Sequence, residues 1–191
     1  MTEKFDPKKL EKLNNPQGLL DIPPDYIGQK LDIQNPDVFV EIGAGTAFFS
    51  RAFFEKYGPS TLYACDLSEM MIDWMTENVA PKYPAIIPLK TEESVVPLDD
   101  EIADLVFMIN LHHELENPLL LLGDAYRILK PDGKIFVVDW KKIEMPQGPP
   151  VEIRCLPEEV EGQMREAGFQ DIVIDSGLPK HFLVVAKKVA S

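Results

Sequence analysis

The pattern of hydrophobic and polar positions changes near residue 37. Residues 1–36 are interrupted by Pro and Asn and carry scattered apolar side chains, which predicts one or two short helices and no strand. From residue 37 onward, short apolar runs alternate with amphipathic stretches, a pattern typical of parallel strands joined by helical crossovers. We therefore predict an N-terminal helical flap over residues 1–36 and one α/β domain over residues 37–191.

Seven apolar runs predict the strands of this domain, and four amphipathic stretches predict its helices. The predicted strands cover residues 38–42, 61–65, 85–89, 103–110, 134–139, 171–175 and 182–186. The predicted helices cover residues 47–57, 69–79, 118–129 and 157–168. A turn region with Ser and Gly separates the last two runs, as in an antiparallel pair. The sequence thus predicts a doubly wound, mostly parallel seven-stranded sheet with helices on both faces and an antiparallel strand at its C-terminal edge.

Composition and charge narrow the kinds of partner. The chain has 191 residues, enough for one substantial core, and its formal charge is 19 − 32 = −13 at pH 7. This charge disfavours nucleic acid and anionic membranes as partners. We find no apolar run long enough to span a bilayer and no signal-peptide core, so we expect a cytoplasmic protein. Cys65 and Cys155 stand singly, which predicts reduced thiols and no metal site.

A glycine turn lies between the first predicted strand and the following helix. It reads Glu-Ile-Gly-Ala-Gly-Thr-Ala over residues 41–47. Gly43 and Gly45 let the backbone approach a ligand, and the start of the helix offers unpaired N–H donors. The turn therefore predicts a nucleotide-like ligand, although a purely conformational role for the glycines is the alternative.

An acidic residue and a missing small residue refine this prediction. Phe48 stands where a dinucleotide-binding turn needs Gly or Ala, so a pyrophosphate site is not supported. Asp66 ends the second strand, 66 − 43 = 23 residues after Gly43. A carboxylate at this place can accept hydrogen bonds from both ribose hydroxyls.

These motifs resemble those of the class I S-adenosylmethionine-dependent methyltransferases, over about residues 37–140. Residues 40–47 are similar to the family's first motif, and Asp66 matches its ribose-binding acid. Residues 97–106 resemble the loop into the fourth strand, and residues 126–134 resemble the turn into the fifth. The resemblance implies a Rossmann-like sheet and S-adenosyl-L-methionine as the cofactor.

The sequence departs from the family after the third strand. The family often has an Asp there that contacts the adenine amino group, whereas this chain has Lys90-Thr91-Glu92-Glu93. Thr91 or Glu92 must then make that contact. The cofactor-binding residues implied by the resemblance are Glu41, Gly43, Ala44, Gly45, Asp66, Leu67, Thr91, Glu92 and Asn110.

Candidate catalytic residues follow the fourth and fifth strands. In open parallel sheets, ligands bind beyond the carboxyl ends of the strands where the strand order reverses. His112, His113 and Glu114 follow the fourth strand, and Asp139 and Trp140 end the fifth. An imidazole there can position a substrate or remove its proton, so His113 and Asp139 are our catalytic candidates. In the alternative reading, His112 packs against the next helix and His113 caps it.

We therefore predict an S-adenosylmethionine-dependent methyltransferase that acts on a small-molecule acceptor by in-line transfer. The acceptor and its nucleophilic atom, whether O, N, S or C, stay open, and the chain is a candidate for homodimer formation. One alternative is a non-catalytic S-adenosylmethionine-binding regulatory module. Another is a short-chain NAD(P)-dependent oxidoreductase, because Tyr-x-x-x-Lys spacing occurs at Tyr26/Lys30 and Tyr126/Lys130.

Overall fold

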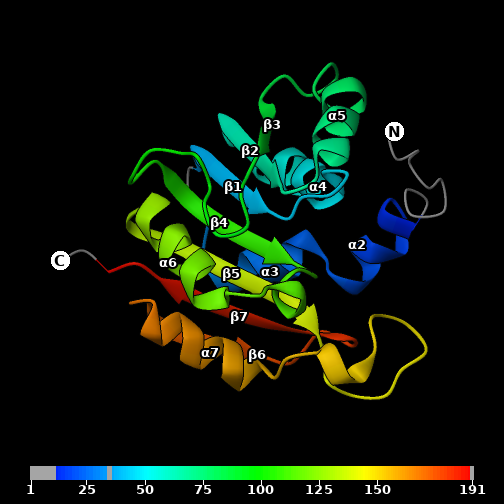
Figure 1. Ribbon diagram of the computed structural model, residues 1–191, viewed down its shortest axis with the longest axis vertical. Helices are drawn as coiled ribbons and strands as arrows, with labels where there is room; N and C mark the ends of the chain where they lie inside the picture. The colour runs from blue at the N-terminus through cyan, green and yellow to red at the C-terminus, as the bar shows by residue number, and fades with distance from the viewer. Residues whose placement is uncertain (1–11, 34–35, 190–191) are drawn as a thin grey trace.

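A seven-stranded sheet forms the centre of the computed structural model, which describes residues 12–33 and 36–189 (Figure 1). The strand order is β3-β2-β1-β4-β5-β7-β6. The strands are β1 (Val38–Ile42), β2 (Thr61–Asp66), β3 (Ile86–Lys90), β4 (Ala103–Ile109), β5 (Leu129–Trp140), β6 (Gln170–Asp175) and β7 (His181–Lys187). The pairs β3–β2, β2–β1, β1–β4 and β4–β5 are parallel, whereas β7 runs antiparallel to both of its neighbours. The predicted mostly parallel, doubly wound sheet is confirmed.

Helices cover both faces of the sheet, as the sequence predicts. The α-helices are α2 (Gln17–Asp21), α3 (Pro24–Leu31), α4 (Phe48–Tyr57), α5 (Glu69–Asn78), α6 (Pro118–Ile128) and α7 (Pro157–Glu166), with short 3-10 turns η1 (His112–Glu114) and η2 (Val151–Ile153). Helices α6 and α7 pack on one face, in front of the sheet in Figure 1, and α3, α4 and α5 contribute to the core on the other. No helix within the described ranges is long and apolar enough to cross a membrane.

The central strands are buried on both faces because their side chains alternate between two cores. Along β5, Ile135 and Val137 belong to the core under α6 and α7, whereas Phe136 belongs to the core under α3 and α4. On this second face, Phe53 of α4 lies over Phe107 and Phe136, with ring centroids 5.0 and 5.5 Å away. Such apolar burial on both sides is typical of a parallel sheet.

The last strand lies one position inside the edge of the sheet. All residues of β7 pair with β5, from Lys134↔Lys187 to Trp140↔His181, and β6 pairs on the outer side of β7. Apolar, mostly buried residues make up β7, whereas β6 is half-exposed. The more hydrophobic strand, β7, therefore takes the inner position. The predicted antiparallel pair forms, and β6 is its outer strand.

The segment 130–133, predicted as a turn, forms an irregularity at the start of β5. The pairing of β5 with β4 jumps from Ala103↔Leu129 to Leu105↔Lys134, and Asp132 has a φ of +66°. The chain thus bulges outward there and resumes regular pairing at Lys134.

The N-terminal segment divides into two parts that pack differently. Ile27 and Leu31 of α3 are 0% and 1% exposed and belong to the core around Phe53. Helix α2, in contrast, contains no buried residue and lies at the edge of the sheet toward which β4 and β5 point (Figure 1). Residues 1–11 and 34–35 of the predicted flap lie outside the described residues. Because α3 is part of the core, the flap stays a prediction for the segment that precedes α3.

We expect Leu31→Ala to lower the free energy of unfolding by about 3 kcal/mol, because it removes a fully buried side chain and leaves a cavity. Leu20→Ala is the matched control, since Leu20 of α2 is 72% exposed, and it should change stability little. Urea denaturation of both variants measures the difference. Equal effects would show that α3 does not belong to the cooperative core.

Candidate active site

A cavity of about 860 Å³ opens at the carboxyl edge of the sheet. Its walls come from the loops after β1, β2, β3, β4 and β5, from α2 and from the start of β7. The nine residues that the sequence predicts for cofactor binding all line it: Glu41, Gly43, Ala44, Gly45, Asp66, Leu67, Thr91, Glu92 and Asn110. Residues from five separate loops thus meet in one place, because β1 and β4 are neighbours at the point where the strand order reverses.

The glycine turn has the backbone conformation that its sequence suggests. Gly43 and Gly45 have φ of +76° and +56°, a region that residues with a side chain rarely adopt. A Cβ at Gly43 would lie 2.8 Å from the side chain of Leu111, whereas one at Gly45 would lie within 4 Å of Leu13 alone among the described residues, at 3.8 Å. The turn is therefore closely packed at Gly43 and leaves room for a ligand beside Gly45.

Asp66 joins this turn to the loop after β2. One carboxylate oxygen accepts a hydrogen bond from the backbone N–H of Gly45 at 2.7 Å, and the other accepts one from Ser68 N–H at 2.8 Å. These bonds fix the carboxylate at the cavity wall, and each oxygen keeps a further lone pair for a ligand hydroxyl. The position of Asp66 suits the predicted contact with a ribose.

Glu41 is a buried acid at the cavity wall. Its side chain accepts a hydrogen bond from the Ser50 hydroxyl of α4 and is 2% exposed. Burial is the main cause that raises the pKa of Glu41 to about 8, and it outweighs the lowering by Ser50. An uncompensated acid here is therefore largely protonated at neutral pH, and a cationic ligand group beside it would favour its ionised form.

Asn110 leaves an acceptor without a partner. Its backbone has a φ of +57°, and its N–H donates to Val138 O at 2.9 Å. The side-chain Oδ1 is buried and accepts no hydrogen bond from residues 12–33 or 36–189. A buried polar atom of this kind is costly unless a ligand donates to it. Glu41 and Asn110 together fit a ligand that carries a cationic hydrogen-bond donor.

The remaining predicted cofactor residues occupy the rim and floor. Thr91 is buried, and its N–H donates to Asp66 O at 3.0 Å, so the loop after β3 is held against the loop after β2. Glu92 is exposed, and Leu67 is 56% exposed at the rim. Both are accessible to a flat ring that lies across this end of the cavity.

His113 and Asp139 form a hydrogen-bonded pair at the ends of β4 and β5. Asp139 is fully buried and accepts hydrogen bonds from His113 Nδ1 at 2.8 Å and from His113 N–H at 3.0 Å. His113 lines the cavity, whereas Asp139 lies behind it. Asp139 is thus placed as a positioning residue rather than as one that touches a ligand in the cavity.

The charge of Asp139 also controls the titration of His113. Burial by itself lowers the pKa of His113, but the hydrogen bond and charge of Asp139 and the charge of Glu114 outweigh burial and raise it. His112 has a different environment, because its Nε2 bonds Gln163 of α7 at 2.7 Å. His112 therefore packs into the fold, but against α7 rather than against the next helix, α6. His113 faces the cavity and bonds Asp139, whereas the N-cap of α6 is Asn117.

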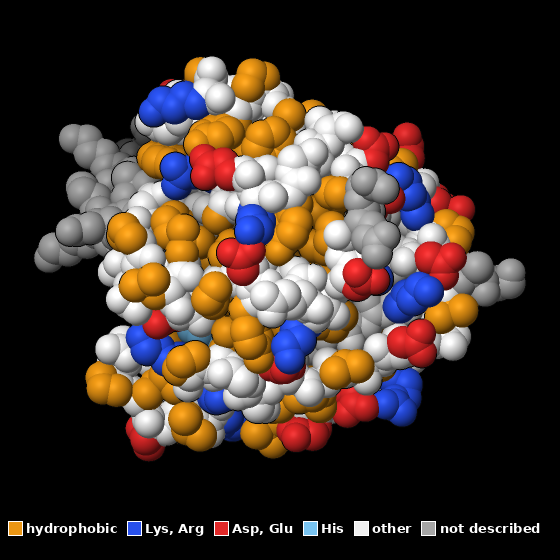
Figure 2. Space-filling model, turned by 180° about the vertical axis from the view of Figure 1, so that it is seen from behind, with side chains coloured by type: hydrophobic (Ala, Val, Ile, Leu, Met, Phe, Trp, Pro, Cys, Tyr) orange, Lys and Arg blue, Asp and Glu red, His pale blue; other side chains and the backbone are white. Residues whose placement is uncertain are grey.

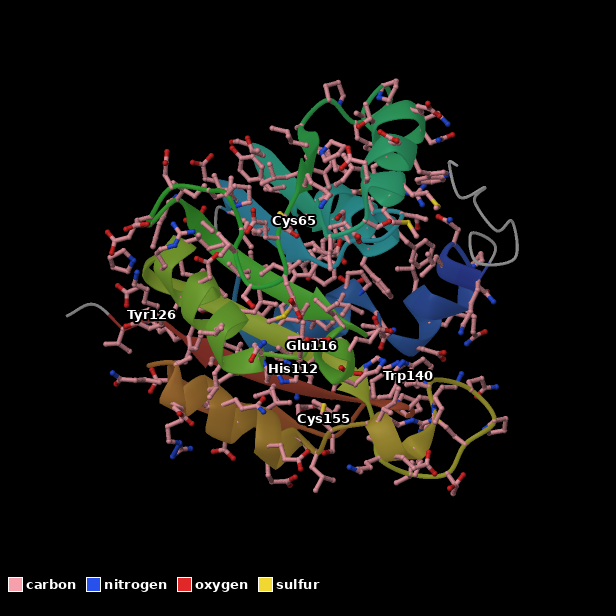
Figure 3. The ribbon with its side chains drawn as sticks, viewed as in Figure 1. Cys65, His112, Glu116, Tyr126, Trp140 and Cys155 are labelled. Atoms are coloured by element: carbon pink, nitrogen blue, oxygen red, sulfur yellow. The ribbon has the colours of Figure 1, made fainter. Side chains whose placement is uncertain are left out.

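Arg154 is a structural residue that the sequence analysis missed. Its buried guanidinium donates five hydrogen bonds to carbonyl oxygens of Lys141, Ile143, Gln147 and Pro149, at 2.6 to 3.1 Å. It thereby holds the loop after β5 against Trp140, which lies at the end of that strand (Figure 3). An isolated Arg after a Pro/Gly-rich loop carries no motif that predicts this role.

The fold and the cavity fit an α/β protein that binds a nucleotide-like cofactor, with a glycine turn after β1 and an acid after β2. Comparison with known proteins is more specific. The methyltransferase-domain family model matches residues 40–137. The chain is 30% identical to an S-adenosylmethionine-dependent methyltransferase from Aquifex aeolicus, over 97% of this chain and 100% of that one, with a TM-score of 0.86. The chain therefore belongs to the S-adenosylmethionine-dependent methyltransferase family.

Two further relatives are similar to this chain over only part of their own length. An uncharacterised methyltransferase-like protein of Schizosaccharomyces pombe is 29% identical over 114 residues, which are 60% of this chain and 42% of that protein. The chain thus matches about two-fifths of the length of this curated relative. A phosphoethanolamine N-methyltransferase of Haemonchus contortus, solved with S-adenosyl-L-methionine, shares the fold at 15% identity, with a TM-score of 0.73 over 87% of this chain and 52% of that one.

We expect Asp139→Asn to lower the pKa of His113, because the variant removes the charge that opposes the effect of burial. The chain has three histidines, so NMR titration can follow each imidazole separately. Glu114→Gln should shift the pKa of His113 in the same direction without disturbing the buried pair. Asp73→Asn, an exposed change on α5, is the control. An unchanged pKa of His113 in both test variants would contradict the assigned electrostatics.

Proposed function

We propose that this protein transfers the methyl group of S-adenosyl-L-methionine to a small-molecule acceptor that enters the same cavity. The main support for this proposal is that one continuous cavity contains both the predicted cofactor residues and further space for an acceptor. It reaches from the predicted cofactor residues Glu41 and Asp66 to His113, and on to Trp140 and His181. Its volume is within the range of sites for small ligands, about 300–1,000 Å³.

The residues present suit each part of the cofactor. Asp66 can accept hydrogen bonds from the ribose hydroxyls, and the open space beside Gly45 admits the body of the molecule. Asn110 Oδ1 and the buried Glu41 are suited to an ammonium group. When bound, the cofactor supplies a methyl group that is already activated on a sulfonium. The protein's tasks are then to align the acceptor in line with that methyl group and to exclude water.

His113 is suited to accept a proton from an acceptor O or N. Asp139 binds Nδ1 of the ring, so Nε2 is the nitrogen left for a substrate, and the carboxylate of Glu114 lies 3.6 Å from it. Only the neutral imidazole can act as a base, and its raised pKa makes the protonated form more abundant below neutrality. Proton removal by His113 is therefore favoured as the pH rises.

The charge of the chain supports a small acceptor over a macromolecular one. The net charge of −13 opposes the binding of nucleic acid and of anionic membranes. Figure 2 shows Lys and Arg side chains interspersed with Asp and Glu on the face seen from behind. A cytoplasmic location and homodimer formation stay predictions from the sequence.

The geometry disfavours the oxidoreductase alternative. Tyr26 and Lys30 both bind Asp175, away from the cavity wall. Tyr126 lies at the opposite end of the sheet from Trp140 (Figure 3), and Lys130 pairs with Asp104. The regulatory alternative requires a cofactor site without space for an acceptor, and the extension of the cavity toward Trp140 favours catalysis instead.

We expect Asp66→Ala to weaken S-adenosylhomocysteine binding by about 2 kcal/mol, because the variant removes charge-assisted hydrogen bonds to the ribose. Calorimetry with S-adenosylhomocysteine measures the loss, and NAD should bind neither protein. Asp73→Ala, an exposed change on α5, should leave the affinity unchanged. Unaltered binding by Asp66→Ala would remove the basis of the cofactor assignment.

We also propose that the segment before α3 covers the acceptor end of the cavity. Leu13, Asn15, Gln17 and Gly18 line the cavity from this side, and Asp21 of α2 pairs with Lys180 at 2.8 Å. Closure of such a cover would expel water from the reacting atoms.

We expect amide hydrogen exchange in residues 12–22 to slow when S-adenosylhomocysteine binds, because the ligand would fill the space beneath this segment. Amides of α3 serve as the internal control, since Ile27 and Leu31 are buried in the core. Equal protection of residues 12–22 with and without ligand would indicate a static wall instead of a cover.

A further inference from the structure

His181 is a buried imidazole that forms no hydrogen bond within the part of the chain that the structure describes. It begins β7 directly opposite Trp140 in the register, and the two ring centroids are 4.2 Å apart at an angle of 44°. The residue is 1% exposed, and neither Nδ1 nor Nε2 has a partner. Yet His181 lines the same cavity as the predicted cofactor residues.

Two unpartnered nitrogens in one buried ring need a physical reason. A buried polar group without a partner costs about 1–3 kcal/mol, and such groups are rare in native proteins. A phenylalanine would fill the space without this cost. The structure therefore retains a destabilising polar ring at the cavity wall, as is common where a ligand supplies the missing bonds.

Burial keeps the imidazole of His181 neutral, and charged groups of both signs lie around it. Burial is the main cause that lowers its pKa to about 4. The carboxylates of Asp21 and Asp139 raise this pKa, and the ammonium groups of Lys180 and Lys141 lower it. Asp21 and Lys180 are already bound to each other. The imidazole thus offers one donor and one acceptor without a net charge beside it.

Apolar side chains that are firmly held form one wall beside His181. Ile22, Trp140 and Pro149 line this end of the cavity. Gly148 packs against the indole so closely that a Cβ there would lie 2.8 Å from it, and Arg154 fixes the loop that carries Gly148. A rigid aromatic wall of this kind suits a flat, apolar ligand.

We propose that His181 and Trp140 form an acceptor subsite, in which the imidazole binds a hydroxyl group on an uncharged, planar, apolar molecule. The inference rests on the proposed function, and it specifies the substrate class of the same cavity. A hydroxyl group both donates and accepts hydrogen bonds, so it can bind the protonated or the unprotonated nitrogen of the neutral imidazole. A reorientation of the ring can present either nitrogen to it. Because both nitrogens are enclosed, entry of the ligand requires a small shift of α2, which contains no buried residue.

Three probes with the same ring system and different charge test the ligand class. They are 2-naphthol, which is uncharged, 2-naphthoate, which is an anion, and 2-naphthylmethylamine, which is a cation at pH 7. Each is titrated by NMR into the protein saturated with S-adenosylhomocysteine. We expect 2-naphthol to bind most tightly and to shift the ring ¹⁵N signals of His181. Tighter binding of either charged probe, or unshifted His181 signals, would overturn the proposal.

Two phenylalanine variants separate a ligand-binding role from a structural one. His181→Phe should weaken 2-naphthol binding about tenfold, the loss of roughly one hydrogen bond in a dry pocket. The same variant should not lower the melting temperature of the ligand-free protein, because it removes unpaired polar atoms. His112→Phe is the matched control, since His112 is also buried with one unpartnered nitrogen but lies outside the cavity wall. It should leave 2-naphthol binding unchanged.

The possible failures are distinguishable. If S-adenosylhomocysteine does not bind, the proposed function itself is wrong. If it binds, but His181→Phe lowers the melting temperature and leaves 2-naphthol affinity intact, His181 is a structural residue and only the inference fails. Should His181→Phe not fold, the ¹⁵N shifts of His181 in the unmodified protein decide the question alone.

Discussion

The burial of both faces of the central parallel strands is the constraint on which the rest of this molecule depends. Parallel strands must be joined by crossovers, and each crossover helix covers one face. Phe53 of α4 packs on Phe107 and Phe136, while α6 and α7 cover the opposite side. With both faces closed, the loops at the carboxyl edge are the part of the sheet that remains open to a ligand. The cavity lies there because the loops after several parallel strands meet at this edge, where the strand order reverses.

Buried polar groups at that edge fall into two kinds. Arg154 and Asp139 are fully bonded within the protein and hold a loop and an imidazole in place. Among the described residues, Asn110 Oδ1 and both nitrogens of His181 have no hydrogen-bond partner, and the buried Glu41 has Ser50 as its hydrogen-bond donor. The bonded groups give the site its rigidity, and the unbonded ones mark where ligand atoms would be recognised. Asn110 and His181 line the cavity, whereas Arg154 and Asp139 lie outside its lining, so ligand atoms would meet a wall that other side chains hold in place.

Local patterns were enough to predict the residues that line one side of the cavity. The glycine turn, Asp66 and the ends of β3 and β4 are all short segments whose place follows from the strand they end, and parallel strands bring their carboxyl ends together. The other side depends on contacts between distant parts of the chain. His181 meets Trp140 only because β7 inserts beside β5, and Arg154 meets its carbonyl partners only after the loop after β5 has folded back. Neither residue lies in a motif.

The sequence by itself determined the class of fold, the strands and helices and the glycine turn, because each depends on periodicity or spacing along a continuous segment. The resemblance of its motifs to a known family then indicated the family. Only the tertiary structure decided that α3 is part of the core, that β7 takes the inner position beside β5, and that Asp139 lies behind His113. It also brought Trp140 and His181 into contact at one end of the cavity. The physical reason is the same in each case. Packing between residues far apart in the chain decides which apolar surfaces cover one another. It also decides whether a buried polar atom has a hydrogen-bond partner.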